Sequence, residues 1–151
     1  MSDDHIYDMR QHQAGWAEEL RRAGLRATSQ RIAVLEFLDR HPHSDAEAIF
    51  QGVRAVLPTI SLQAVHGIVH DLTAKGIVAR IDLPDSASAR YETRIGDNHH
   101  HIQCIVCGRI EDLDCTVGHA PCLAPSHDHG MRIIEASVTY RAICAACDKD
   151  H

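Results

Sequence analysis

The chain has 151 residues, of which 44% are hydrophobic and only 4% are aromatic, and its formal net charge is −6. This length suits one domain or two small ones, and a small domain with few aromatic anchors often depends on a metal or a partner subunit. The acidic N-terminus lacks the apolar segment of a secretory signal, and no apolar run reaches the length of a membrane span. We therefore expect a cytoplasmic protein, whose six cysteines are metal ligands or thiols rather than disulfides.

Two helices are predicted at the start of the chain. Residues 14–24 have a helical apolar pattern that ends at Gly24. Thr28 can cap a second helix that runs to about Arg40, and Pro42 prevents its continuation.

A third and a fourth helix are predicted next. Ser44 and Glu47 have the spacing of a capping box, which opens the third helix. Its predicted apolar face consists of Ile49, Phe50, Val53, Val56 and Leu57. Ser61 caps the fourth helix, which ends at Gly76.

The apolar period changes to two after the fourth helix, so residues 77–83 and 89–94 are predicted to form a hairpin. Helices followed by a hairpin are the order of a winged helix, a variant of helix-turn-helix whose last helix enters the DNA major groove. The outward residues of that helix are predicted to be Gln63, His66, Gly67, His70 and Lys75.

Charge gives a mixed indication about DNA. The net charge argues weakly against nucleic-acid binding, because phosphate contacts require basic surface. However, residues 21–31 contain four arginines and no acid. This stretch is either a solvated helix face or a local basic surface, and Arg22 and Arg26 are our candidates for contacts with DNA.

The second half of the chain is rich in β-patterns. Short strands are predicted at 99–106 and 109–114, and residues 131–144 alternate in polarity. We place the domain boundary so that residues 1–85 form the winged-helix domain and residues 86–151 form a smaller second domain. The predicted fold class is α+β.

Two C-x-x-C motifs indicate a metal site in the second domain. Each motif presents two sulfurs at the separation that tetrahedral zinc requires, and four thiolates leave no open position for catalysis. We therefore predict a structural Zn²⁺ held by Cys104, Cys107, Cys144 and Cys147. Redox-active or unliganded cysteines are the alternative. Cys115 and Cys122 lie outside the motif and are either plain thiols or redox thiols.

Histidines and carboxylates indicate a second, harder metal site. His99 and His101 are two residues apart on a predicted strand, so they share a face, and alternation allows Asp112 to approach that face from the next strand. Glu92 ends the preceding strand. Such ligands suit Fe²⁺, Mn²⁺ or Zn²⁺, although a histidine-rich surface strand can also take up metals without specificity. The pattern alone does not select His43.

The sequence resembles the ferric uptake regulator (Fur) superfamily of metal-dependent repressors from about Ala14 to Asp148. The motifs that carry the resemblance are GLRATSQRIAVLEFL, HSDAEAIF, ISLQAVHGIVHDLTAKGIV, ARYE, DNHHHIQCIVCGRIED and the terminal CAAC. The resemblance implies an N-terminal winged helix joined to a small α/β dimerisation domain with a structural zinc. It also implies a homodimer that binds two-fold symmetric operator DNA. The fourth helix departs from the family pattern, because His66 replaces a usual tyrosine and the apolar Gly67 and Ile68 follow it.

Residue roles follow from the same resemblance. The four cysteines of the two C-x-x-C motifs match the structural zinc ligands. The regulatory ligands, for Fe²⁺ or Mn²⁺ with Zn²⁺ or Ni²⁺ as substitutes in vitro, are matched by His43, Glu92, His99, His101 and Asp112. A third metal site of some members is matched by His100, His119 and His129.

The most similar subgroup regulates catalase and catalase-peroxidase genes in response to redox signals. We therefore expect a repressor that peroxide releases from DNA through oxidation of a ligand histidine. An iron- or zinc-level sensor and a thiol switch that uses Cys115 and Cys122 are the alternatives. A metalloenzyme is disfavoured, because the zinc deaminase pattern and the H-E-x-x-H motif are both missing. A zinc-stabilised interaction module without DNA binding is the third class.

Overall fold

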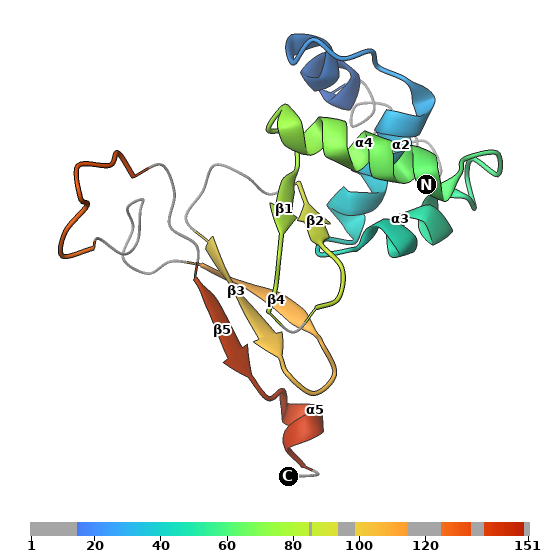
Figure 1. The fold of residues 1–151 in the computed structure, drawn as a ribbon. Coiled ribbons are helices and arrows are strands. Elements are labelled where there is room, and N and C mark those ends of the chain that lie inside the picture. The colour runs from blue at the N-terminus through green and yellow to red at the C-terminus, as the bar shows by residue number, and fades with distance from the viewer. Residues whose placement is uncertain (1–14, 85, 94–98, 115–124, 134–137, 150–151) are drawn as a thin grey trace, which may run out of the picture. The chain divides into compact units, whose positions relative to one another are not determined.

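A computed structural model describes residues 15–84, 86–93, 99–114, 125–133 and 138–149. The chain divides into two compact units (Figure 1). Unit 1 contains residues 1–82 and 87–95, and unit 2 contains residues 83–86 and 96–151. Unit 1 therefore extends beyond the boundary at residue 85 that the sequence suggested, because its second strand pairs with its first. Among the described residues, no helix is both long and apolar enough to cross a membrane.

Three helices of unit 1 agree with the sequence prediction at the start that the structure describes. Residues 15–22 are helical. The Thr28 hydroxyl accepts a hydrogen bond from the Arg31 N–H and caps α2 (Ser29–Arg40). In the same way, the Ser61 hydroxyl accepts from the Ala64 N–H and caps α4 (Leu62–Ala74). These short polar side chains satisfy N–H groups that have no partner within the helix.

The start and the apolar face of α3 (Ala46–Val53) differ from the prediction. The predicted capping box is wrong, because the Asp45 carboxylate accepts the Ala48 N–H at 2.8 Å while the Ser44 hydroxyl donates to the His41 carbonyl. Val56 lies beyond the helix and is 68% exposed, so it is not part of the apolar face. The helix ends at Val53, and its periodicity therefore does not continue to Val56.

A two-stranded antiparallel wing completes unit 1. It consists of β1 (Ala79–Ile81) and β2 (Arg90–Glu92), with Arg80 opposite Tyr91. The helices and the wing enclose one apolar core, whose fully buried members include Leu20, Val34, Leu35, Leu38, Ile49, Val65 and Leu72. Burial of this many aliphatic side chains stabilises unit 1 without any metal.

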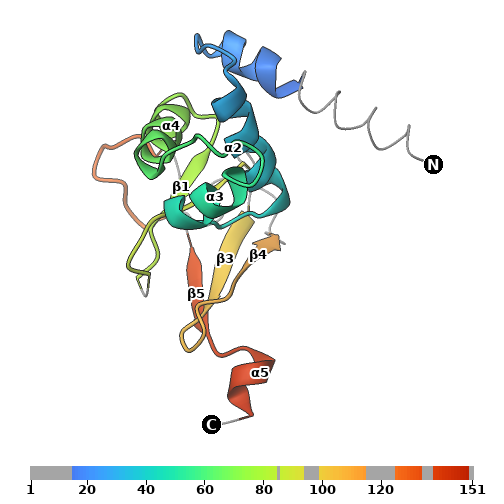
Figure 2. The ribbon, with the colours of Figure 1, turned by 90° about the vertical axis from the view of Figure 1, so that its right-hand side faces the viewer.

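The described part of unit 2 is a three-stranded sheet with a short helix. The strand order is β4-β3-β5, with β3 (His99–Cys104) antiparallel to β4 (Ile110–Asp114) and parallel to β5 (Thr139–Ala142). Figures 1 and 2 show β3 between the other two strands. The helix α5 (Ala145–Asp148) follows β5 and is not predicted by the sequence pattern. Residues 134–137 of the predicted long strand lie outside the described residues.

Candidate metal centres and nucleic-acid face

The four cysteines of the two C-x-x-C motifs come together at one end of the sheet in unit 2. Cys104 ends β3, Cys107 lies in the turn before β4, and α5 carries the second motif from Cys144 to Cys147. All four sulfurs lie within 4.8 Å of one another, and the sulfurs of Cys107 and Cys144 are 3.8 Å apart. A tetrahedral ion with metal–sulfur bonds of about 2.3 Å requires sulfur separations of roughly 3.8 Å. The cysteines are free thiols, so their geometry fits zinc.

Backbone N–H groups prepare this site for a cation. Those of Cys107 and Cys144 lower the pKa of the Cys104 thiol to about 6, because they stabilise its thiolate. The Cys147 N–H lowers the pKa of the Cys144 thiol in the same way. In contrast, the hydrogen bond with Cys144 and burial raise the pKa of Cys147 to about 12. A fourth thiolate in this cluster therefore needs a cation to balance its charge.

Two of the predicted regulatory ligands form a pair within unit 1. His43 Nε2 lies 3.2 Å from Glu92 Oε2, and the two side chains are 9% and 2% exposed. The backbone of His43 is fixed to β2, because its N–H donates to the Tyr91 carbonyl and its carbonyl accepts from Arg90. His43 also has a left-handed φ of 66°, which is uncommon for a residue with a side chain. A buried histidine held beside a buried carboxylate is a preformed pair of metal ligands.

Two further predicted ligands form a pair within unit 2. The antiparallel register places His101 directly opposite Asp112, and His101 Nε2 lies 3.4 Å from Asp112 Oδ1. His101 is buried and Asp112 is half-buried. The backbone of His99 lies in the same strand, opposite Asp114, and its side chain lies outside the described part of the chain.

The predicted third site is not assembled by the residues that the structure describes. His100 is buried in β3, and its Nδ1 has no hydrogen-bond partner among those residues. His129 is exposed, and its ring lies 4.4 Å from that of His127. Neither His100 nor His129 joins a group of three or more potential ligands in the described ranges. His119, Cys115 and Cys122 fall outside the described residues.

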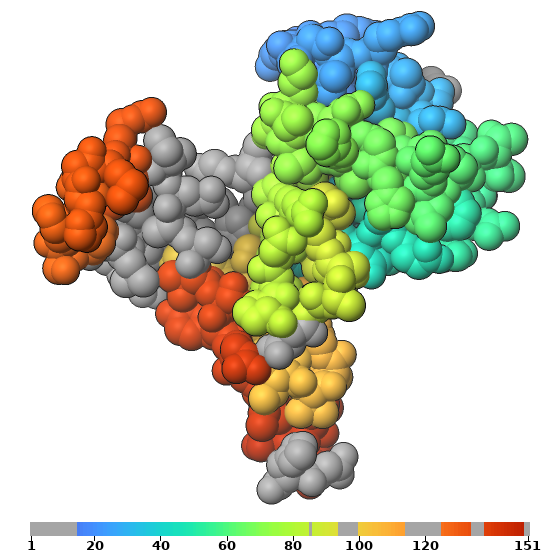
Figure 3. Space-filling model, viewed as in Figure 1, coloured from blue at the N-terminus to red at the C-terminus, as the bar shows by residue number. Residues whose placement is uncertain are grey.

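The predicted DNA-contacting residues are all exposed. They are Arg22, Arg26, Gln63, His66, His70 and Lys75. In Figure 3 the surface of α4, drawn in green, is uncovered toward the viewer. Arg22 forms an ion pair with Glu18 at 2.7 Å, and Arg31 lies 3.5 Å from Asp71, so part of the arginine-rich stretch is neutralised within the chain.

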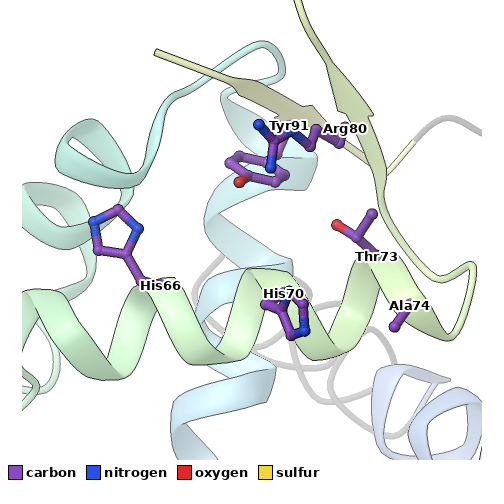
Figure 4. Close-up of a pocket in the computed structure, with 6 residues that line it drawn as sticks. All are labelled: His66, His70, Thr73, Ala74, Arg80 and Tyr91. Carbon is purple, nitrogen blue, oxygen red and sulfur yellow. The ribbon is translucent and has the colours of Figure 1, made fainter.

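A hollow of about 360 Å³ separates α4 from the wing, and Figure 4 shows the side chains around it. Its lining by described residues contains two imidazoles, a guanidinium and two hydroxyls, in the set His66, His70, Thr73, Ala74, Arg80 and Tyr91. Arg80 is a candidate that the sequence argument missed. Its position on the predicted wing strand was the available signal, since the wing of a winged helix also lies near DNA.

The comparisons with known proteins agree with this arrangement. The model of the "Ferric uptake regulator family" matches residues 22–141. The "Transcriptional regulator FurA" of Mycobacterium tuberculosis is 52% identical over 132 residues, which cover 87% of this chain and 89% of the relative. The "Peroxide-responsive repressor PerR" of Staphylococcus epidermidis is 30% identical, with 87% of both chains covered.

The solved structures show the same fold. The ferric uptake regulator Fur of Helicobacter pylori superposes with a TM-score of 0.68 at 20% identity. The superposition covers 92% of this chain and 93% of the Helicobacter pylori chain. This likeness confirms the predicted α+β architecture of an N-terminal helical domain and a C-terminal sheet domain. Because the family model and the sequence relatives match most of its length, the chain belongs to the ferric uptake regulator family of metal-dependent transcriptional regulators.

Proposed function

We propose that this protein is a repressor that binds a two-fold symmetric operator as a homodimer when an exchangeable metal is bound. The observation that carries the proposal is the division of the histidine–carboxylate ligands. One pair, His43 and Glu92, belongs to unit 1, and the other, His101 and Asp112, belongs to unit 2. Each pair alone offers too few donors for a selective site. Together with His99 they would supply the five nitrogen and oxygen donors that suit Fe²⁺ or Mn²⁺.

Control of DNA binding follows from linkage. An ion shared between the two pairs stabilises only the arrangement of the units in which both pairs reach it. If that arrangement also binds DNA better, metal and DNA raise each other's affinity by the same factor. The four-cysteine site has a separate task. It holds α5 against the turn between β3 and β4, and its closed coordination leaves it structural.

The hollow beside α4 is the proposed place of contact with the DNA backbone. Its imidazole and guanidinium groups suit a phosphate. The Arg80 guanidinium lies 3.2 Å from the exposed Asp82 carboxylate, so a phosphate would share this cation with Asp82. In a winged helix the recognition helix lies in the major groove, so a groove-edge phosphate would approach the region between α4 and β1. We assign His66 and Arg80 to this contact, and Gln63, His70 and Lys75 to base or backbone contacts.

We further propose that peroxide is the signal. A bound Fe²⁺ would supply the redox chemistry that activates peroxide beside the ligand histidines. One oxygen atom of the peroxide is inserted into a C–H bond of an imidazole, and the other leaves as water. Oxidation of His43 or His99 then removes a ligand, so the metal and the operator are released. The similarity to a protein named as a peroxide-responsive repressor supports this reading, although the mycobacterial relatives named FurA are more similar.

The test is a titration of the anaerobic Fe²⁺ form, bound to a DNA duplex that the metal-loaded protein selects from a random-sequence library. One equivalent of peroxide is expected to abolish binding, and mass spectrometry should find one added oxygen on the peptide that holds His43 or His99. The Mn²⁺ form is the control and should stay bound.

Two other results would identify the alternative functions. Unmodified histidines with a new Cys115–Cys122 disulfide would indicate a thiol switch. Retention of DNA at several equivalents of peroxide, with release on chelation, would indicate a metal-level sensor.

A further inference from the structure

Gly67 is a glycine that the chain itself does not need. It lies in the interior of α4, between Leu62 and Ala74, where glycine weakens a helix relative to alanine. The backbone does not require it, because its φ lies outside the left-handed region. Packing does not require it either, since a Cβ at this position would meet no atom of the described residues within 4 Å, apart from its chain neighbours and the backbone of its own helix.

Most other described glycines have a reason within the chain. At Gly52 a Cβ would overlap the ring of Phe37, so α3 can approach that ring only without a side chain. A left-handed φ explains four more, which are Gly24, Gly76, Gly108 and Gly130. Gly15, near the start of the first helix, shares the open surroundings of Gly67. It therefore provides a matched reference outside α4.

The position of Gly67 shows where a partner would meet it. Ile68 and Val69 are buried against the core, whereas Gly67 is exposed with Gln63 and His70 on the outer side of α4. Gln63 lies one turn before Gly67 and His70 lies about one turn after it, so the three adjoin on the helix surface. The helix therefore exposes bare backbone between two hydrogen-bonding side chains.

We propose that Gly67 is a close-approach point, at which the floor of the DNA major groove lies against the backbone of α4. This inference rests on the proposed DNA binding and adds a residue that determines specificity. Without a side chain at this position the helix can lie deeper, so that Gln63 and His70 come within hydrogen-bond distance of base edges. A larger residue holds the helix away and lengthens those bonds, which weakens the discrimination between base pairs.

The experiment measures folding and DNA binding on the same variants. Gly67→Ala should raise the midpoint of thermal unfolding by a few degrees, because alanine favours the helix. The same variant should bind the library-selected duplex about tenfold more weakly, since a methyl group forced into a tight contact is disfavoured. Its affinity for a scrambled duplex of equal length should be unchanged, because that binding depends on charge. Gly67→Leu should lose more of the selective affinity.

Gly15→Ala is the control, and it should leave selective binding unchanged. Selective binding by Gly67→Ala that equals the wild type would overturn the close-approach role while the repressor function stays intact. A metal-loaded wild type that enriches no duplex from the library would instead overturn the proposed function itself. A stabilised Gly67→Ala that has lost selective binding excludes misfolding as the cause and supports the inference.

Discussion

The two units of this chain are held together by different means. Unit 1 contains nearly all of the buried apolar side chains, from Leu20 to Tyr91. Among the described residues of unit 2, only Leu83 and Cys104 are buried apolar residues. Of the eight large apolar residues that are exposed in the described ranges, seven belong to unit 2 and one, Val56, belongs to unit 1. Unit 1 is therefore stabilised by its core, whereas we expect unit 2 to depend on a metal and on a surface that a second subunit can cover.

The two kinds of metal site differ in the same way, since one lies within a single unit and the ligands of the other are divided between both. The four cysteines all lie in unit 2, so an ion there stabilises one unit. The histidine–carboxylate pairs are divided between the units, so an ion shared by them would act on both.

The largest effect is expected from loss of a zinc ligand. Cys104→Ser removes a thiolate whose pKa is lowered to about 6, and the remaining three sulfurs should no longer retain zinc. Structural zinc sites contribute about 10 kcal/mol or more to folding, so unit 2 should lose its amide protection in hydrogen exchange while unit 1 keeps it. Cys115→Ser is the control and should retain zinc. Full amide protection of β3 without bound metal would contradict the expectation that unit 2 needs a metal to fold.

Loss of one regulatory pair should affect DNA binding without affecting either fold. We expect His43→Asn and His101→Ala each to lower metal-dependent operator affinity by more than about tenfold, a typical coupling between two ligands. Asparagine tolerates the left-handed backbone of His43, so the loop conformation is preserved. Fluorescence anisotropy with added Mn²⁺ measures the effect, and zinc content should stay constant. His41→Asn, in the same loop but exposed, should behave as the wild type.

The apolar surface of unit 2 can be tested against Val56, the exposed large apolar residue in the described part of unit 1. Tyr140 is 51% exposed on β5, which is an edge strand of the described sheet. Tyr140→Glu should shift the dimer toward monomer in sedimentation experiments, with a cost of about 2 kcal/mol or more for an anchor residue. Val56→Glu, at a site that is 68% exposed, should leave the dimer unchanged. Equal effects of the two substitutions would remove the distinction between the units.

The smallest effect concerns the cap of α3. The Ala48 N–H lowers the pKa of the Asp45 carboxyl, so the folded state favours the charged form. This stability is present above the unfolded pKa and is lost as the pH falls through the lowered folded value. Asp45→Ala should cost about 1 kcal/mol near neutral pH, whereas Asp45→Asn keeps the cap and should lack the acid dependence. Urea unfolding between pH 7 and pH 3 measures both. If the stability of Asp45→Asn falls with pH as much as that of the wild type, the acid dependence arises from groups other than Asp45.

The sequence by itself determined the features that depend on nearby residues. Thr28 and Ser61 cap helices because their hydroxyls need only reach an N–H three residues later. Each C-x-x-C motif fixes two sulfurs within one turn, so the cluster of four sulfurs could be predicted from spacing. The alternation of β3 and β4 likewise placed Asp112 near His101, and the register confirms it.

The tertiary structure decided the features that depend on distant contacts. His43 has no local pattern, and its selection comes from hydrogen bonds to Tyr91 and Arg90 on a strand almost fifty residues away. Asp45 replaces Ser44 as the cap of α3 because the Ser44 hydroxyl is engaged by His41, while Ser88 donates to the outer oxygen of Asp45. Gly67 is recognisable only once its surroundings are known to be open. Local geometry follows from neighbouring residues, whereas burial and long-range hydrogen bonds exist only after the chain has closed on itself.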